Sequence, residues 1–254
     1  GDKGDPGLDA VGVCPDGVIA GSYSILNASD VAAIAGCSSI TGDLDVKSAA
    51  GLVSVSLPEL ATVGGTLHVQ YNTELASLSL PALTTVGGNL DIESNRALTA
   101  MSLPVLTTVG GNLAVDNNVA LATASVPVLT TVGVDLVVDG NALTTLSLPV
   151  LTTVGGGLIV DSNAALTMLS LPVLATVGAE LYVVNSAALT MLSLPVLTAV
   201  AGGHLYVQGN AALTTLSLPV LATVGFDLYV QTNDALTTLN LPALAMVGGT
   251  LSIH

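Results

Sequence analysis

The side chains that could support chemistry are few and widely spaced. Three histidines, His68, His204 and His254, fall in different parts of the chain, and neither a Ser–His–Asp order nor a phosphate-binding loop accompanies them. General acid–base catalysis needs titratable groups held within reach of one substrate. We therefore expect no catalytic residues and a protein that is not an enzyme.

One run of carboxylates is regular. Acidic residues occupy one outward position in four successive repeats: Glu93, Asp116, Asp139 and Asp161. Like charges stacked opposite one another are destabilising, so a bound cation such as Ca²⁺ would compensate. The other interpretation is a solvated acidic stripe. No repeat supplies a full ligand set, so Ca²⁺ is the only cofactor considered and no metal is firmly assigned.

Farther along the chain the two outward positions of the same strands become aromatic and amide-bearing. They are Tyr182, Tyr206, Tyr229, Gln208 and Gln231. Exposed tyrosines favour contacts with sugars or proteins. The alternative is that the rings stack across repeats and serve stability alone.

A third set of outward positions is hydroxyl-rich and uncharged. Its clearest members are Thr145, Ser147, Thr215, Ser217 and Thr238. Regular ranks of Thr and Ser resemble the flat faces of ice-binding solenoids, although Met168 and Met191 interrupt them. The same composition suits packing against another chain. It also suits an inert surface, since Thr has good strand propensity.

These positions are set by a repeat whose fullest form is Leu-Ser-Leu-Pro-Val-Leu-Thr-Thr-Val-Gly-Gly, at 146–156. Its proline recurs at nearly even spacing from Pro58 to Pro242. A short period sustained over so much of a chain indicates a solenoid. Within 81–103, the segments 89–93 and 100–103 alternate apolar with polar, which predicts short strands. The expected fold is all-β: a parallel β-helix of 22–24-residue coils.

A column of asparagines follows each Gly-Gly strand, with Ser186 as the exception. It comprises Asn72, Asn95, Asn118, Asn141, Asn163, Asn210 and Asn233. We expect each amide to bond the backbone of a neighbouring coil, which is a structural role.

The N-terminal fifth differs from the rest. Residues 1–9 are three Gly-X-Y triplets, which we interpret as the end of a collagen-like stem; a flexible leader is the alternative. Residues 10–50 read as a cap, with a short helix at 31–36, Ser29 or Asp30 at its N-cap, and a first strand at 40–46. Residues 51–254 are the solenoid repeats.

The two cysteines, Cys14 and Cys37, are separated by one repeat length. If the first coil follows the repeat, they lie one above the other and form a disulfide, typical of an oxidising, extracellular setting. Two buried free thiols are the alternative.

Composition excludes some partners. Three basic residues and a net charge of −15 argue against nucleic acid, which requires phosphate neutralisation. Apolar residues never form a run long enough for membrane insertion. Neutral partners such as glycan, protein or ice remain open.

The segment from Ser29 to Leu44 is similar to the start of receptor L-domains, and the body, L-x-x-L-x-L-P-x-L-x-x-V-x-G-x-L-x-V/I-x-x-N, resembles their leucine-rich repeat. The likeness is greatest to fungal cell-wall and bacterial surface members. It implies a right-handed β-helix, secreted or at the cell surface and non-enzymatic. These repeats are far more alike than the degenerate coils of the receptors, which favours a simple or repetitive target.

The last residues, 251–254, stop within a coil. We therefore expect either further chain or docking onto another subunit. Taken together, the sequence predicts an extracellular structural or adhesive module that self-associates, as a trimer through the stem or as a head-to-tail filament. Ice binding is the alternative function.

Overall fold

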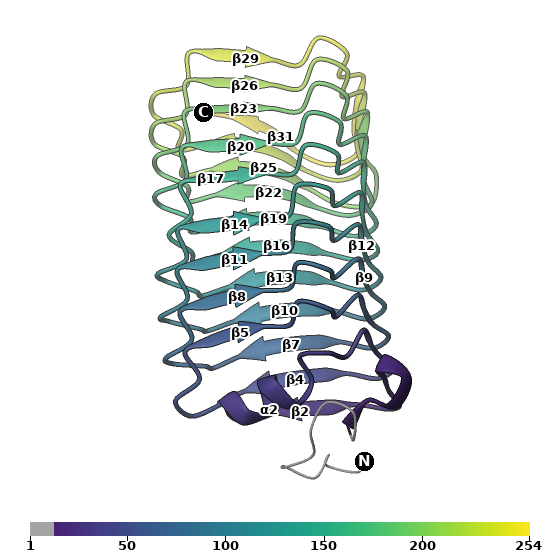
Figure 1. Cartoon of the computed structure of the whole chain (residues 1–254). Helices are drawn as coiled ribbons and strands as arrows, with labels where there is room; N and C mark the ends of the chain where they lie inside the picture. Colours follow the sequence, from purple (N-terminus) through teal and green to yellow (C-terminus); the bar gives the residue numbers. More distant parts are fainter. Residues whose placement is uncertain (1–12) are drawn as a thin grey trace. The chain divides into compact units, whose positions relative to one another are not determined.

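The computed structural model describes residues 13–254, so the Gly-X-Y segment lies outside the described residues. The chain divides into two compact units, Gly1–Pro127 and Val128–His254. Each is a stack of coils, one repeat to a coil, joined by parallel strands (Figure 1). This confirms the predicted all-β solenoid.

Three parallel sheets run along the first unit. The first sheet contains β1 (Val18–Ile19), β3 (Ser39–Ile40), β6 (Thr62–Val63), β9 (Thr85–Val86) and β12 (Thr108–Val109). The second contains β2 (Tyr23–Ile25), β4 (Leu44–Lys47), β7 (Leu67–Gln70), β10 (Leu90–Glu93) and β13 (Leu113–Asp116). The third contains β5 (Ser54–Ser56), β8 (Ser77–Ser79), β11 (Ala100–Ser102) and β14 (Thr123–Ser125).

The second unit repeats this plan. The first-sheet strands are β15 (Thr131–Val132), β18 (Thr153–Val154), β21 (Thr176–Val177), β24 (Ala199–Val200), β27 (Thr223–Val224) and β30 (Met246–Val247). Those of the second sheet are β16 (Leu136–Asp139), β19 (Leu158–Asp161), β22 (Leu181–Val184), β25 (Leu205–Gln208), β28 (Leu228–Gln231) and β31 (Leu251–Ile253).

The third sheet of the second unit is divided into two. One part pairs β17 (Thr145–Ser147) with β20 (Met168–Ser170), and the other joins β23 (Met191–Ser193), β26 (Thr215–Ser217) and β29 (Thr238–Asn240). The repeat gives no indication of this division.

The core follows from the period-2 pattern and the constant register. In β10, Leu90 and Ile92 are buried while Asp91 and Glu93 face outward. Leu90 lies between Leu67 and Leu113 of the adjacent coils. Like residues therefore stack on like. The buried surface is almost wholly aliphatic, and its removal from water is the main stabilising contribution.

Glycine precedes most of the second-sheet strands, where neighbouring coils pack closely. A Cβ added at Gly87 would collide with the carbonyl oxygen of Gly64 in the preceding coil, and one at Gly110 would collide with that of Gly87. At these two positions the strand spacing of about 4.8 Å leaves no room for a side chain.

The asparagine column is bonded as expected in the first unit. The Nδ2 of Asn95 donates to the carbonyl oxygen of Val69 at 2.8 Å and to Oδ1 of Asn118 at 3.1 Å. Its Oδ1 accepts from the backbone N–H of Asn72 at 3.1 Å. Each amide thus links its own coil to the coils on both sides.

The cap contains the expected helix, but the predicted N-cap is wrong. Helix α2 spans Ala28–Ala33 and begins at Asn27, whose side chain accepts from the backbone N–H of Ser29 and Asp30. Asp30 reciprocates by accepting from the N–H of Asn27. These reciprocal hydrogen bonds form a capping box, which places the helix start at Asn27 rather than at Ser29 or Asp30.

The cap is continuous with the solenoid. Strands β1 and β2, which the sequence did not indicate, pair in parallel with β3 and β4. The predicted strand at 40–46 is in fact split between β3 and β4. Cys14 and Cys37 form the disulfide, with their Cα atoms 5.8 Å apart, which confirms that the first coil already follows the repeat.

Candidate functional surfaces

The tyrosine stripe lies on the second sheet of the second unit. The rings of Tyr182 and Tyr206 are stacked with centroids 4.8 Å apart and planes 7° apart, and Tyr229 follows at 5.0 Å with a 36° tilt. His204 adds a tilted contact to Tyr206 at 5.1 Å. The structure therefore brings all three predicted tyrosines together.

This stacking leaves the tyrosines poorly arranged for a sugar. Ring faces that would pack on a sugar are covered by the ring of the next coil, at the separations typical of aromatic pairs. Burial raises the pKa of Tyr206, and the nearby Tyr182 raises it further. The geometry thus favours the interpretation in which the stripe stabilises the stack.

The glutamines beside the rings are also linked to each other. Gln208 donates through Nε2 to Oε1 of Gln231 at 3.0 Å, and Gln231 donates in turn to Oγ of Ser252 at 3.0 Å. Their hydrogen-bonding groups are therefore partly used within the sheet.

The acidic positions fall in both units, two in each. In the first unit Glu93 is in register with Asp116, and Glu93 accepts hydrogen bonds from Nε2 of Gln70 at 3.0 Å and from the hydroxyl of Tyr71 at 3.3 Å. These donors offset the repulsion from Asp116, so a cation is not required there.

In the second unit Asp139 is in register with Asp161. Burial raises the pKa of Asp139, and the charge of Asp161 raises it further. Asp161 accepts from Ser162 at 3.0 Å and from Asn185 at 3.1 Å. Across residues 13–254 no three His, Cys, Asp or Glu side chains converge in a way that could hold a metal ion.

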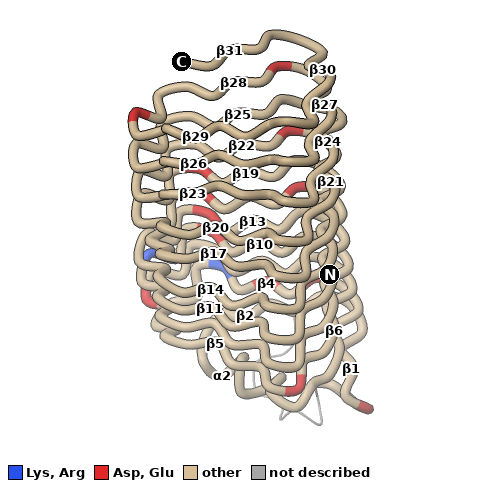
Figure 2. Tube along the Cα trace, turned by 90° about the horizontal axis from the view of Figure 1, so that it is seen from above, with Lys and Arg blue, Asp and Glu red and all other residues tan. Residues whose placement is uncertain are grey.

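The hydroxyl-rich face is the third sheet of the second unit. The structure brings Thr215 and Ser217 into register with Thr238 and Asn240, whereas Thr145 and Ser147 pair with β20 in the other part of the divided sheet. None of its five strands carries a charged residue. Figure 2 shows how few charged residues the described chain holds elsewhere.

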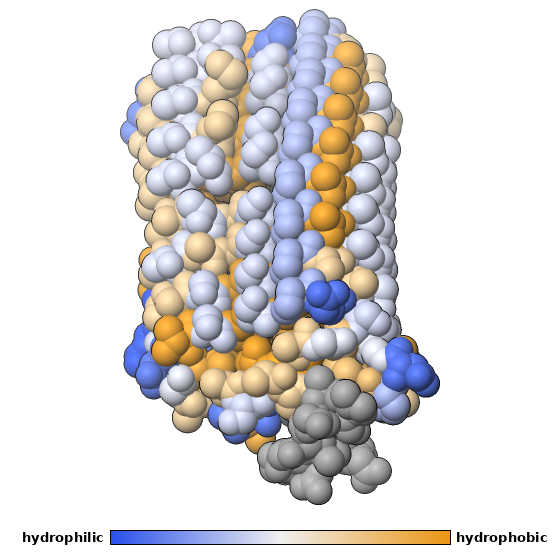
Figure 3. Space-filling model, viewed as in Figure 1, coloured by the Kyte–Doolittle hydropathy of each residue, from blue (hydrophilic) through white to orange (hydrophobic). Residues whose placement is uncertain are grey.

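A column of exposed valines borders this face and was missed from the sequence. It follows the prolines and comprises Val150, Val173, Val196 and Val220, each about two-fifths exposed. In Figure 3 hydrophobic residues form a continuous stripe beside paler columns. The sequence signal for this column was the valine that directly follows these prolines. Proline cannot donate a hydrogen bond in a strand ladder, so it marks a strand end or a corner, where the next side chain can be exposed. The valines and the outward residues of β17, β20, β23, β26 and β29 are called the neutral face below.

A shallow hollow of about 410 Å³ lies on the neutral face where the third sheet divides. Its lining includes Met168, Met191, Pro172 and Pro195. Both methionines are about half exposed. Methionine adapts to irregular apolar surfaces, so this is the most adaptable part of the face.

A charged column on the first unit was also missed. His68 lies in register between Asp45 and Asp91, with Nδ1 3.1 Å from Oδ2 of Asp91. Lys47 forms an ion pair with Asp45 at 2.8 Å. Burial raises the pKa of Asp91, and the charge of His68 opposes that shift. Asp45, His68 and Asp91 are each one repeat length apart, and that spacing could have revealed this column.

Comparison with known proteins adds no assignment, since the chain matches no family model, no curated protein and no solved structure. The resemblance to receptor L-domains therefore stays a prediction. No helix within residues 13–254 has the length and apolar character needed to cross a membrane.

Proposed function

We propose that the protein is an extracellular, non-catalytic structural or adhesive module that associates through the neutral face, and that a second copy of the chain is its first partner. The observation that carries the proposal is a face without charge in a chain of net charge −15. Two such chains repel one another everywhere except where charge is absent.

The composition of the face supports packing rather than simple solvation. Its valines and methionines form an exposed apolar stripe, and contiguous apolar surface of this kind marks interaction sites. Flanking hydroxyls are already engaged in part, since Thr214 donates through Oγ1 to the carbonyl oxygen of Thr190 at 3.0 Å, and Thr237 donates in the same way to Thr214 at 3.3 Å. Fewer hydrogen bonds between these hydroxyls and water are then lost when the face packs against a second copy.

The disulfide and the resemblance to surface proteins support a secreted or cell-surface location. The collagen-like triplets support a trimeric stem. Both features agree with a role outside the cell, where a covalent link in the first coil persists.

Sedimentation velocity on the full chain tests the proposal over micromolar concentrations. We expect the wild type to associate and the double variant Val173→Glu, Val196→Glu to shift toward the monomer. The matched control places the same two charges on the first sheet, as Thr153→Glu with Thr176→Glu, and should associate like the wild type. A wild type that stays monomeric, or association that survives in the neutral-face variant, contradicts the proposal.

Ice binding is the second candidate, favoured by the adjacent hydroxyls and methyls of Thr215 and Thr238 on paired strands. The rank is short, because Met191 occupies the corresponding position on β23. Thermal hysteresis of the purified chain decides this: a measurable freezing gap that Thr215→Lys removes supports it, and the absence of ice shaping eliminates it.

A further inference from the structure

Tyr71 is the one aromatic residue at a turn position that other coils of the first unit fill with Ser or Asn. The turn residue after each four-residue second-sheet strand has a positive φ, and in the first unit this position holds Ser48, which precedes the buried Ala49, and Tyr71, Ser94 and Asn117, which precede buried asparagines. Tyr71 has φ 59°. Asn tolerates this left-handed conformation and Ser is small, whereas a bulky ring is a genuine outlier, as is the β-branched Thr232 at the same turn in the second unit (φ 54°). Such strain persists mainly where a function uses it.

The Tyr71 side chain is held in place although it is half exposed. Its hydroxyl lies 3.3 Å from Oε1 of Glu93, and its backbone N–H donates to the Glu93 carbonyl oxygen at 3.1 Å. The other carboxylate oxygen of Glu93 accepts from Gln70 at 3.0 Å. Glu93 therefore orients both the ring and the Gln70 amide, with Tyr71 52% exposed to solvent.

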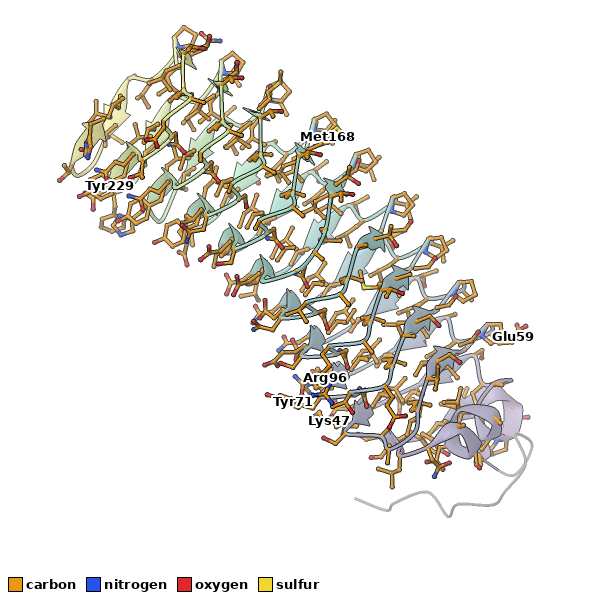
Figure 4. The ribbon with its side chains drawn as sticks, turned by 90° about the vertical axis from the view of Figure 1, so that its left-hand side faces the viewer. Lys47, Glu59, Tyr71, Arg96, Met168 and Tyr229 are labelled. Atoms are coloured by element: carbon orange, nitrogen blue, oxygen red, sulfur yellow. A yellow bond between two sulfur atoms is a disulfide. The ribbon has the colours of Figure 1, made fainter. Side chains whose placement is uncertain are left out.

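Both basic residues of the described chain flank this ring. Lys47 is in register with Gln70, and Arg96 follows Asn95, whose Oδ1 accepts from the N–H of Asn72 next to Tyr71. Figure 4 shows Lys47, Tyr71 and Arg96 close together at one edge of the coils. Lys47 is paired with Asp45, whereas Arg96 is exposed and forms no ion pair within residues 13–254.

We propose that Tyr71, with Gln70, Glu93 and Arg96, binds a neutral glycan. An exposed aromatic ring offers an apolar surface to the C–H face of a sugar while its own hydroxyl is fixed. Gln70 and Glu93 accept from sugar hydroxyls, and Arg96 and Gln70 donate to them. Among residues 13–254 no other aromatic ring stacks on Tyr71, unlike the tyrosines of the second unit.

The local charge balance selects a neutral ligand over an anionic one. The strands beside the ring carry three carboxylates, Asp45, Asp91 and Glu93, which outnumber Lys47 on the strands and Arg96 in the turn. An acidic glycan would meet net repulsion in a chain that is already strongly acidic. The site lies on the second sheet of the first unit and does not depend on the neutral face.

The repeat itself supplies the best test. Tyr71→Ser installs the residue found at the same turn in neighbouring coils, and Arg96→Ala installs the residue of several later repeats. If Tyr71 serves binding, Tyr71→Ser should relieve strain and raise the melting temperature by about 2 °C while lowering glycan affinity at least about tenfold. A purely structural role predicts a lower melting temperature instead.

The probes are cellohexaose, laminarihexaose and maltohexaose, titrated into the full chain by calorimetry, with a polygalacturonate hexamer as the charged comparison. We expect one neutral hexamer to bind the wild type, weaker binding by Arg96→Ala, and partial retention by Tyr71→Phe, which keeps the ring. Thr232→Ser, at the same turn position in the second unit, is the matched control and should bind normally. The proposal is overturned by no binding of any neutral hexamer, by stronger binding of polygalacturonate, or by unchanged binding in Tyr71→Ser.

Discussion

The two units carry the same repeat but differ at one buried turn position. In the first unit Asn72, Asn95 and Asn118 follow one another without a break. In the second, Ser186 takes the place of asparagine, and its hydroxyl reaches only the carbonyl oxygen of Val184 in its own coil, at 3.4 Å. The backbone N–H of Ser186 still donates to Asn210 at 3.0 Å, so the column is interrupted on one side alone.

The third sheet divides at the same boundary between coils. Asn163 belongs to the coil of β20, Ser186 to the coil of β23, and these strands lie in different sheets. The first unit keeps four strands in one third sheet. We infer that the boundary at Ser186 is loosened because its hydroxyl stays within its own coil, whereas Asn163 donates to the carbonyl oxygen of Val138 in the preceding coil.

The largest expected effect comes from breaking the intact column. Asn95→Ala removes bonds to Asn72, Val69 and Asn118 and leaves buried polar groups without partners, so we expect a loss of about 3–4 kcal/mol of unfolding free energy. Ser186→Ala should cost less than about 1 kcal/mol. Urea unfolding of both variants gives the comparison, and equal losses would show that the column is not cooperative.

Removing the disulfide should be nearly as costly, and only in the first unit. Cys14→Ala with Cys37→Ala opens a loop closed across 23 residues, for which chain entropy predicts about 3 kcal/mol. Hydrogen exchange read by mass spectrometry should show faster exchange in the cap and first coils. Equal acceleration in both units would contradict this assignment.

Repairing the interrupted column should stabilise the second unit. Ser186→Asn supplies an amide that can reach the neighbouring coil, for a gain of about 1 kcal/mol. If β20 and β23 then pair in one sheet, peroxide should oxidise Met168 and Met191, which lie on these two strands, more slowly. Peptide mass measures this oxidation. Ser193→Asn, an outward change on the same coil, is the control and should alter neither quantity.

The smallest effect concerns the acidic pair of the second unit. Folding raises the pKa of Asp139, so the folded protein holds that proton more tightly, and stability is lost as the pH rises from the unfolded pKa through the folded one. Asp139→Asn should therefore raise the melting temperature at pH 7. At pH 3, below the ordinary value of 3.8, the variant and wild type should melt alike; a persistent difference there would show that charge is not the cause.

The candidate surfaces were only partly predictable. Register could be counted from the repeat step, so the stacking of Tyr182 on Tyr206 and of Thr215 on Thr238 followed from sequence alone. Whether the tyrosine faces are covered, whether Glu93 has donors and how far Tyr71 is strained depend on rotamers and backbone angles. Spacing does not determine those quantities.

The sequence by itself determined the coil, its inward Leu and Val columns and its glycine turns, because a strict period forces like residues into contact at every step. Only the tertiary structure decided where the regularity fails: the helix that begins at Asn27, the division between β20 and β23, and the ring of Tyr71 held in a left-handed turn. These depend on which of several near-equal hydrogen bonds forms, between neighbouring coils at the division and at Tyr71, and within the cap at Asn27. Such differences of about 1 kcal/mol are settled by three-dimensional packing rather than by residue type.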